Sequence, residues 1–193
     1  KAIELDPNFA NAHSNLGNIL RDFGNLKDAE ICHRKAIKLN PNYAIAHCNL
    51  GNALKDLGKL KDAELSFRKA IELNPNLIFA HSNLGIILKD IDKLEEAEIS
   101  TRKAIELFPD FANAHLNLGN IFRDKGKLED AELSYRKAIE INPDYVEAYS
   151  NLAIILRDID KLEEARICVD KIMCIRPWSI LGSFSFNYLI KSD

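Results

Sequence analysis

The sequence predicts an all-α solenoid in which a pair of antiparallel helices repeats along the chain. The first observation is that all six prolines are spaced 34 residues apart, at positions 7, 41, 75, 109, 143 and 177. The second is that apolar residues between successive prolines recur in two blocks at helical spacing. Because the neighbouring residues repeat together with the prolines, we interpret the period as an internal repeat of helix pairs.

This period defines five full units, which we expect to span 10–43, 44–77, 78–111, 112–145 and 146–179. Residues 1–9 match the end of a further unit, and residues 180–193 partly match a beginning, so we predict a truncated repeat and a capping or linker helix. The chain starts without an initiator methionine or a signal-peptide core, and we therefore expect the native N-terminus to be missing.

Glycine and proline mark the expected helix ends. The first helix of a unit should end at a glycine, because glycine readily adopts the left-handed conformation of a C-terminal cap. Aspartate, which adopts that conformation less easily, replaces this glycine in two units. The residues concerned are Gly24, Gly58, Asp92, Gly126 and Asp160. The second helix should end near the proline, whose ring removes a donor and biases the preceding residue away from helix.

A further glycine occurs inside the first helix of four units, where it costs about 1 kcal/mol relative to alanine. We expect close approach of the paired helix, with small residues such as Ala29 facing it, to offset this cost. The glycines are Gly17, Gly51, Gly85 and Gly119, and the fifth unit has Ala153 instead.

A 34-residue helix pair with Leu-Gly, then alanine, then proline at these offsets resembles the tetratricopeptide repeat. The family's large residue is also present, at Leu20, Leu54, Leu88, Phe122 and Leu156. Its usual tryptophan is replaced by His13, His47, His81, His115 and Tyr149, and its late alanine by Ile172 in the fifth unit. The resemblance implies a right-handed superhelical solenoid whose first helices line a concave groove.

One stripe of each first helix, at offsets i, i+4, i+7 and i+11, lies apart from core-facing residues such as Leu16 and is expected on the concave wall. Its second position is asparagine in every unit, at Asn15, Asn49, Asn83, Asn117 and Asn151. Its third position holds Asn18, Asn52, Ile86, Asn120 and Ile154. The same wall should include Phe79 and the carboxylates of Asp56, Asp90 and Asp124.

Each asparagine offers two donors and an acceptor, which suit the C=O and N–H of a peptide unit. Helices pack about 8–10 Å apart, and an extended chain rises about 3.3 Å per residue, so successive carboxamides could hold roughly every third ligand residue. The row resembles the asparagine ladder of O-linked N-acetylglucosamine transferases, which implies binding of extended polypeptide. The sequence therefore predicts a peptide-binding scaffold without catalysis of its own. The alternative is that asparagine is merely tolerated on a solvated groove.

Two other functions remain open. The chain could be the substrate-recognition arm of a larger enzyme, such as a glycosyltransferase, with a catalytic domain beyond Asp193. It could also assemble with copies of itself through the ends of the solenoid, which would give a homo-oligomeric structural protein.

Charge and composition exclude several classes of partner. The 26 basic and 29 acidic residues are interspersed, which argues against nucleic acid. No apolar run reaches the roughly 20 residues of a membrane span. The four cysteines lack metal-site spacing, and the histidines of successive units stand too far apart to share a metal. We therefore expect no cofactor, no metal and a cytoplasmic location.

Charged residues also repeat. A basic residue followed by aspartate, as in Arg21 and Asp22, is expected to form a self-neutralising surface pair. Glu30 and Arg34 represent an i, i+4 pair that recurs in later units and is reversed as Arg166 and Asp170 in the fifth. We interpret these pairs as a solvated convex face.

Overall fold

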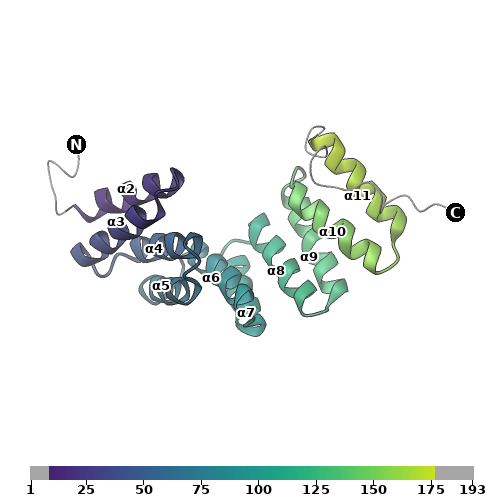
Figure 1. Cartoon of the computed structure of the whole chain (residues 1–193). Helices are drawn as coiled ribbons and strands as arrows, with labels where there is room; N and C mark the ends of the chain where they lie inside the picture. The colour runs from purple at the N-terminus through teal and green to yellow at the C-terminus, as the bar shows by residue number, and fades with distance from the viewer. Residues whose placement is uncertain (1–8, 177–193) are drawn as a thin grey trace. The chain divides into compact units, whose positions relative to one another are not determined.

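The computed structural model describes residues 9–176, which form ten α-helices in consecutive antiparallel pairs and contain no strand (Figure 1). The chain divides after Asp110 into two compact units. The first unit contains α2 (Ala10–Asp22), α3 (Leu26–Leu39), α4 (Ala44–Asp56), α5 (Leu60–Leu73), α6 (Ile78–Asp90) and α7 (Leu94–Leu107). The second contains α8 (Ala112–Asp124), α9 (Leu128–Ile141), α10 (Val146–Asp158) and α11 (Leu162–Ile175). The predicted all-α class is confirmed.

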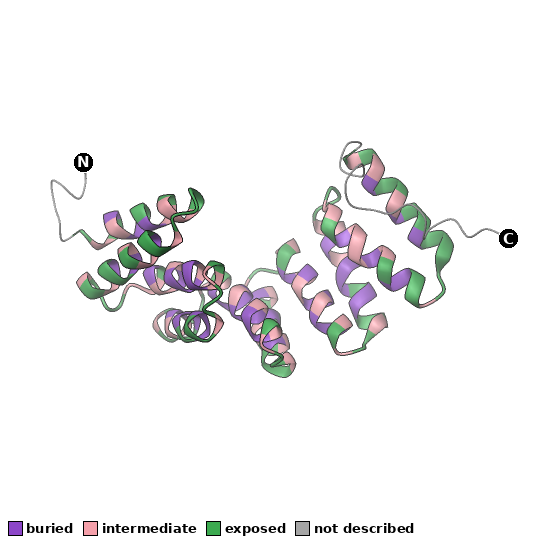
Figure 2. Cartoon of the chain, viewed as in Figure 1, coloured by how far each residue is buried: buried purple, intermediate pink, exposed green. Residues whose placement is uncertain are grey.

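Within each unit, every helix packs against its neighbours in sequence, and buried residues lie where the helices of a pair face one another (Figure 2). In the first unit α4 packs against both α3 and α5, and the first helices α2, α4 and α6 also contact one another in order. In the second unit α10 contacts α8, α9 and α11. The predicted truncated repeat at 1–9, except Phe9, and the predicted capping helix at 180–193 lie outside the described residues.

The prediction that Leu16 faces the core is wrong, because its side chain is 36% exposed whereas the equivalent Leu50 is only 5% exposed. Leu50 lies on α4, which packs between α3 and α5. No helix of the described residues precedes α2. One apolar side of α2 therefore remains exposed, including the side chain of Ile19, and Phe23 directly after α2 is exposed as well.

The left-handed C-terminal caps occur where the sequence predicts them. Gly24, Gly58 and Gly126 have φ of 80°, 74° and 72°, and Asp92 and Asp160 have φ of 61° and 63°. In these caps the backbone N–H two residues past the end of a first helix donates a hydrogen bond to a carbonyl of that helix. For example, the N–H of Gly58 donates to the Lys55 carbonyl at 2.9 Å. The conformation is therefore common to all five pairs, although an L side chain adopts it at a cost.

Replacing Asp92 with glycine should raise the free energy of unfolding by about 0.5–1 kcal/mol, because glycine has no Cβ to strain at positive φ. The reciprocal change Gly58→Asp should destabilise the chain by a similar amount. Urea denaturation of both variants checks this prediction. A loss of stability in Asp92→Gly would contradict it.

The loops at the prolines are stabilised by short turns. Each second helix in the first two pairs ends two residues before proline, and the intervening asparagine accepts a hydrogen bond from the backbone N–H two residues further on. Asn40 Oδ1 accepts from Asn42 at 3.2 Å, and Asn74 Oδ1 accepts from Asn76 at 3.1 Å. Such side-chain turns explain why asparagine precedes proline here.

The glycines inside the first helices make room for a side chain of the paired helix. A Cβ built on Gly51 would lie 2.7 Å from the Phe67 ring, and one on Gly119 would lie 2.5 Å from the Tyr135 ring. Both rings are completely buried. Close approach of the paired helix is confirmed, and larger side chains fill the space beside Gly51 and Gly119. The small residues expected on the second helix, such as Ala29, are completely buried.

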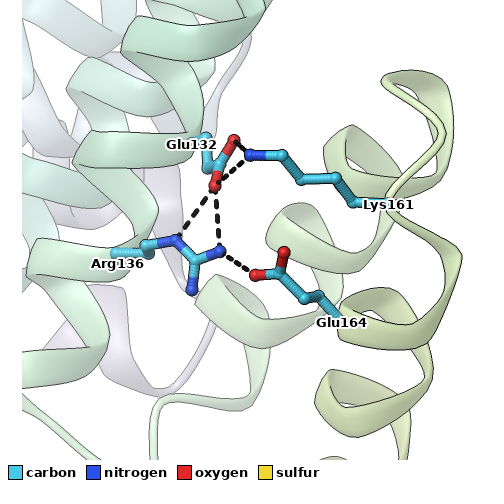
Figure 3. Close-up of polar contacts among 4 residues, drawn as sticks. All are labelled: Glu132, Arg136, Lys161 and Glu164. Carbon is cyan, nitrogen blue, oxygen red and sulfur yellow. Dashed lines mark hydrogen bonds and ion pairs between the residues drawn. The ribbon is translucent and has the colours of Figure 1, made fainter.

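The Glu–Arg pairs are solvated on their arginine side, as expected, but the expectation is wrong for the glutamates Glu64 and Glu132, which are buried. Glu132 is buried, and it binds Arg136 of its own helix at 2.9 Å and Lys161, the residue before α11, at 2.9 Å (Figure 3). Arg136 in turn binds Glu164 of α11 at 2.5 Å. Burial alone would raise the pKa of Glu132, but its two cationic partners outweigh burial and hold the pKa below its ordinary value.

The same network connects the second and third pairs of the first unit, where Glu64 binds Arg68 at 2.8 Å and Lys93 at 3.0 Å. Arg68 also binds Glu96. These ion pairs join α5 to α7 and α9 to α11, so they fix successive repeats to one another. In the fifth repeat Arg166 pairs with Glu163 at 3.5 Å, not with Asp170 as predicted.

Candidate functional site

The predicted peptide-binding asparagines lie one on each first helix. Asn15 is exposed, and the other four are half-buried, at Asn49, Asn83, Asn117 and Asn151. The helices α2, α4 and α6 carry the first three within one unit, and α8 and α10 carry the other two within the second. Four of the five side chains are therefore neither core residues nor freely solvated ones.

In the first unit the carboxamides hydrogen-bond to the preceding first helix. The Nδ2 group of Asn49 donates to Ser14 Oγ at 3.2 Å, and that of Asn83 donates to Asn52 Oδ1 at 2.9 Å. Each of these bonds uses one of the two N–H groups of the carboxamide. The orientation of both amides is therefore fixed before any ligand binds.

The second unit repeats this arrangement. Asn151 Nδ2 donates to Asn120 Oδ1 at 2.9 Å, and the Tyr135 hydroxyl donates to the same oxygen at 2.8 Å. Burial raises the pKa of Tyr135 to about 12, so its hydroxyl remains a donor at neutral pH. The carbonyl oxygens of Asn52 and Asn120 are thus engaged within the protein, which sequence reasoning did not anticipate.

Asn18 differs from its equivalents. Its Oδ1 is buried without a hydrogen-bond partner among residues 9–176, and so are both ring nitrogens of His33. His33 holds the place of Tyr135, and its ring lies against Gly17 as the tyrosine ring lies against Gly119. With histidine in place of tyrosine, the first pair therefore keeps buried polar atoms, in Asn18 and His33, that have no hydrogen-bond partner among the described residues.

Models of the family described as tetratricopeptide repeat match residues 1–31, 66–99 and 101–132 and, separately, 44–77. Another, described as TPR repeat, matches residues 17–58 and 119–158. The chain belongs to the tetratricopeptide repeat family. A search of curated proteins finds no match.

Solved structures with the same tetratricopeptide repeat fold include MamA, which is 26% identical with a TM-score of 0.75 over 83% of this chain and 94% of MamA. YrrB, described as a TPR protein with an unusual peptide-binding site, is 24% identical with a TM-score of 0.70 over 92% of each chain. PilF of Pseudomonas aeruginosa is 24% identical with a TM-score of 0.80, covering 86% of this chain and 75% of PilF.

Apolar residues flank the carboxamides in the first compact unit, which contains α2 to α7. Phe79 is 62% exposed and Ile45 is 49% exposed, at equivalent positions of α6 and α4. Each precedes the asparagine of its own helix by four residues and so lies on the same face. The amide row of this unit therefore adjoins two exposed apolar side chains.

The carboxylates predicted on this face are paired with cations. Lys89 binds Asp90 at 2.8 Å and Arg123 binds Asp124 at 3.3 Å, as expected for self-neutralising pairs. Arg21, however, reaches from α2 to Asp56 of α4 at 3.0 Å. The face therefore carries little uncompensated charge.

The histidines at the family's tryptophan position bind the preceding loop. His47 Nε2 lies 3.0 Å from the Pro41 carbonyl oxygen, and His81 Nε2 lies 2.8 Å from that of Pro75. No cluster of three potential metal ligands occurs among the described residues, and no helix within them is long and apolar enough to cross a membrane. His47 and His81 therefore join α4 and α6 to the turns before them.

Proposed function

We propose that the face of the first helices that carries the asparagine row binds an extended polypeptide segment through its backbone. The observation that supports this most is the fixed orientation of Asn49, Asn83 and Asn151. Each donates one N–H to the preceding first helix. The other N–H and the carbonyl oxygen of the same amide are suited to the C=O and N–H of a peptide unit.

Fixed amides favour binding because little side-chain entropy is lost when the ligand arrives. A hydrogen bond contributes about 0.5–1.5 kcal/mol net, so one carboxamide that makes two bonds can change affinity about tenfold. Backbone contacts of this kind accept many sequences. Selectivity would come from apolar ligand side chains that lie against Ile45 and Phe79.

The similarity to solved tetratricopeptide repeat structures supports the proposed peptide binding at the level of the fold. YrrB, which has the same architecture, is described as having an unusual peptide-binding site. The row also resembles the asparagine ladder of O-linked N-acetylglucosamine transferases. The proposal assigns the chain the role of an interaction scaffold and assigns no catalytic residue.

Asn49→Ala tests the proposal, with Ser14→Ala as its matched control. Both changes remove the hydrogen bond between Asn49 and Ser14 and should destabilise the chain equally, by about 0.5–1.5 kcal/mol. Only Asn49→Ala removes the carboxamide. Fluorescence anisotropy with a peptide selected from a random display library should show binding about tenfold weaker for Asn49→Ala. The loss should be clearly smaller for Ser14→Ala, which keeps the carboxamide and removes only the bond that fixes its orientation. Equal affinities in the two variants would reduce Asn49 to a structural role.

Self-assembly is a second candidate, which the exposed apolar face of α2 favours. Leu16, Ile19 and Phe23 are exposed there, whereas the equivalents of Leu16 in later pairs are buried. A second copy could cover this face. Light scattering over a range of protein concentrations would show a rising mass if it does, and a constant monomer mass if it does not.

A further inference from the structure

Two similar hollows lie in the first unit, away from the asparagine row. The first, of about 390 Å³, is bounded by α3, α4 and α5, and the second, of about 650 Å³, by α5, α6 and α7. All eight positions that line the first hollow also line the second, 34 residues further on, and Arg102 and Glu106 line only the second. The apolar residues of the first hollow are Ile37, Leu50 and Leu65, and those of the second are Ile71, Leu84 and Ile99.

Each hollow combines a buried floor with an exposed apolar wall. Leu50 and Leu84 are buried, whereas Leu65 is 67% exposed and Ile99 is 70% exposed. A single exposed apolar residue is ordinary, but the position of Leu65 and Ile99 is aliphatic and exposed in all five repeats. The other three are Ile31, Leu133 and Ile167. A side chain that entered such a hollow would cover this wall and gain apolar burial.

The charges around the first hollow are cationic. Arg34, Lys38 and Lys69 line it, and no acidic side chain does. Arg34 pairs with Glu30 at 2.9 Å, and Lys69 pairs with Glu72 at 2.6 Å. Lys38 has no ion pair among the described residues. Its ammonium is therefore available to an acidic group of a partner.

The second hollow provides an internal comparison, because Glu72 holds the place of Lys38 there. Glu72 and Glu106 both line it, so its cations face carboxylates of the same chain. The two hollows thus share their aliphatic positions, but the second is lined by two carboxylates and the first by none. This difference favours an acidic occupant for the first hollow only.

We propose that the first hollow binds an acidic polypeptide segment of a partner protein. A large apolar side chain of that segment enters between Ile37, Leu50 and Leu65, and a neighbouring carboxylate pairs with Lys38. The volume is near the lower limit of the roughly 300–1,000 Å³ of ligand sites, which suits one or two side chains. This surface is formed mainly by second helices, so it is independent of the asparagine row and could be occupied at the same time.

The test uses the full chain with isotope-labelled isoleucine and leucine methyl groups. The probe is a synthetic peptide in which one leucine is flanked by aspartate and glutamate. Two matched peptides replace either the acidic residues with lysine or the leucine with serine. The acidic leucine peptide should shift the methyl signals of Ile37, Leu50 and Leu65, and the matched peptides should bind at least about fivefold more weakly.

Lys38→Glu, which copies the second hollow, should weaken binding of the acidic peptide at least about fivefold without loss of stability. Asn49→Ala should leave the peptide-induced shifts of the Ile37 and Leu65 methyl signals unchanged, which separates the hollow from the asparagine row. Three results would overturn the proposal: equal shifts with the lysine peptide, unchanged affinity in Lys38→Glu, or shifts confined to Ile45 and Ile86.

Discussion

Acidification from pH 7 to pH 4 will destabilise the first helix pair by roughly 3 kcal/mol through His33 alone. The ring is completely buried, and its nitrogens have no hydrogen-bond partner in the described part of the chain. Burial and, secondly, the nearby Arg21 lower the pKa of His33 from 6.5 to about 4. The unfolded chain therefore binds a proton that the folded chain rejects.

The sign follows from that difference. The contribution of neutral His33 to the free energy of unfolding is fully present above the unfolded pKa of about 6.5. It is lost as the pH falls towards the folded pKa of about 4. Urea titrations of the wild-type chain and of His33→Phe, which copies Phe67, measure the effect as a difference. The gap between the two curves should change by roughly 3 kcal/mol across this range. Parallel curves would show that His33 contributes nothing to acid sensitivity.

Gly51→Ala should destabilise the chain by about 1–2 kcal/mol, although alanine is the better helix former. The new methyl would lie 2.7 Å from the buried Phe67 ring. The fifth repeat has Ala153 and Val169 at these two positions. In a Phe67→Val background the methyl should find space, so the same Gly51→Ala change should become stabilising by up to about 1 kcal/mol.

A double-mutant cycle of Gly51 and Phe67, followed by thermal denaturation, measures this reversal of sign. Ala153→Gly is the matched control and should cost about 1 kcal/mol, since Val169 leaves room for the alanine methyl. If Gly51→Ala stabilised the wild-type chain, the ring could not be the reason for glycine at this position.

The fold could be predicted because its signals are local and recur in each repeat. The proline spacing locates the loops, and Gly58 indicates a left-handed cap. Each signal depends on the backbone conformation of a single residue. Even Asp92, which lacks glycine's freedom, adopts the predicted positive φ, as the residue at every equivalent cap does. Backbone preferences of this kind can be read from the sequence without knowledge of tertiary contacts.

Contacts between helices were harder to predict. The pairing of Glu64 with Arg68 is four residues apart and therefore visible in the sequence, but its pairing with Lys93 spans 29 residues. The bond from Asn83 to Asn52 spans 31 residues and depends on how successive first helices pack. The sequence signal for this bond is asparagine at the position of Asn52, which the third and fifth repeats replace with isoleucine.

Methylation of the peptide backbone tests most directly whether the asparagine row binds extended polypeptide. A peptide selected against the chain would be N-methylated at one backbone nitrogen at a time, which removes a donor while the side chains stay the same. The account predicts binding roughly two- to tenfold weaker at positions roughly three residues apart, since each methyl removes one hydrogen bond. In Asn49→Ala, methylation at the one position that Asn49 binds should cause no further loss. Unchanged affinity at every methylated position would contradict it.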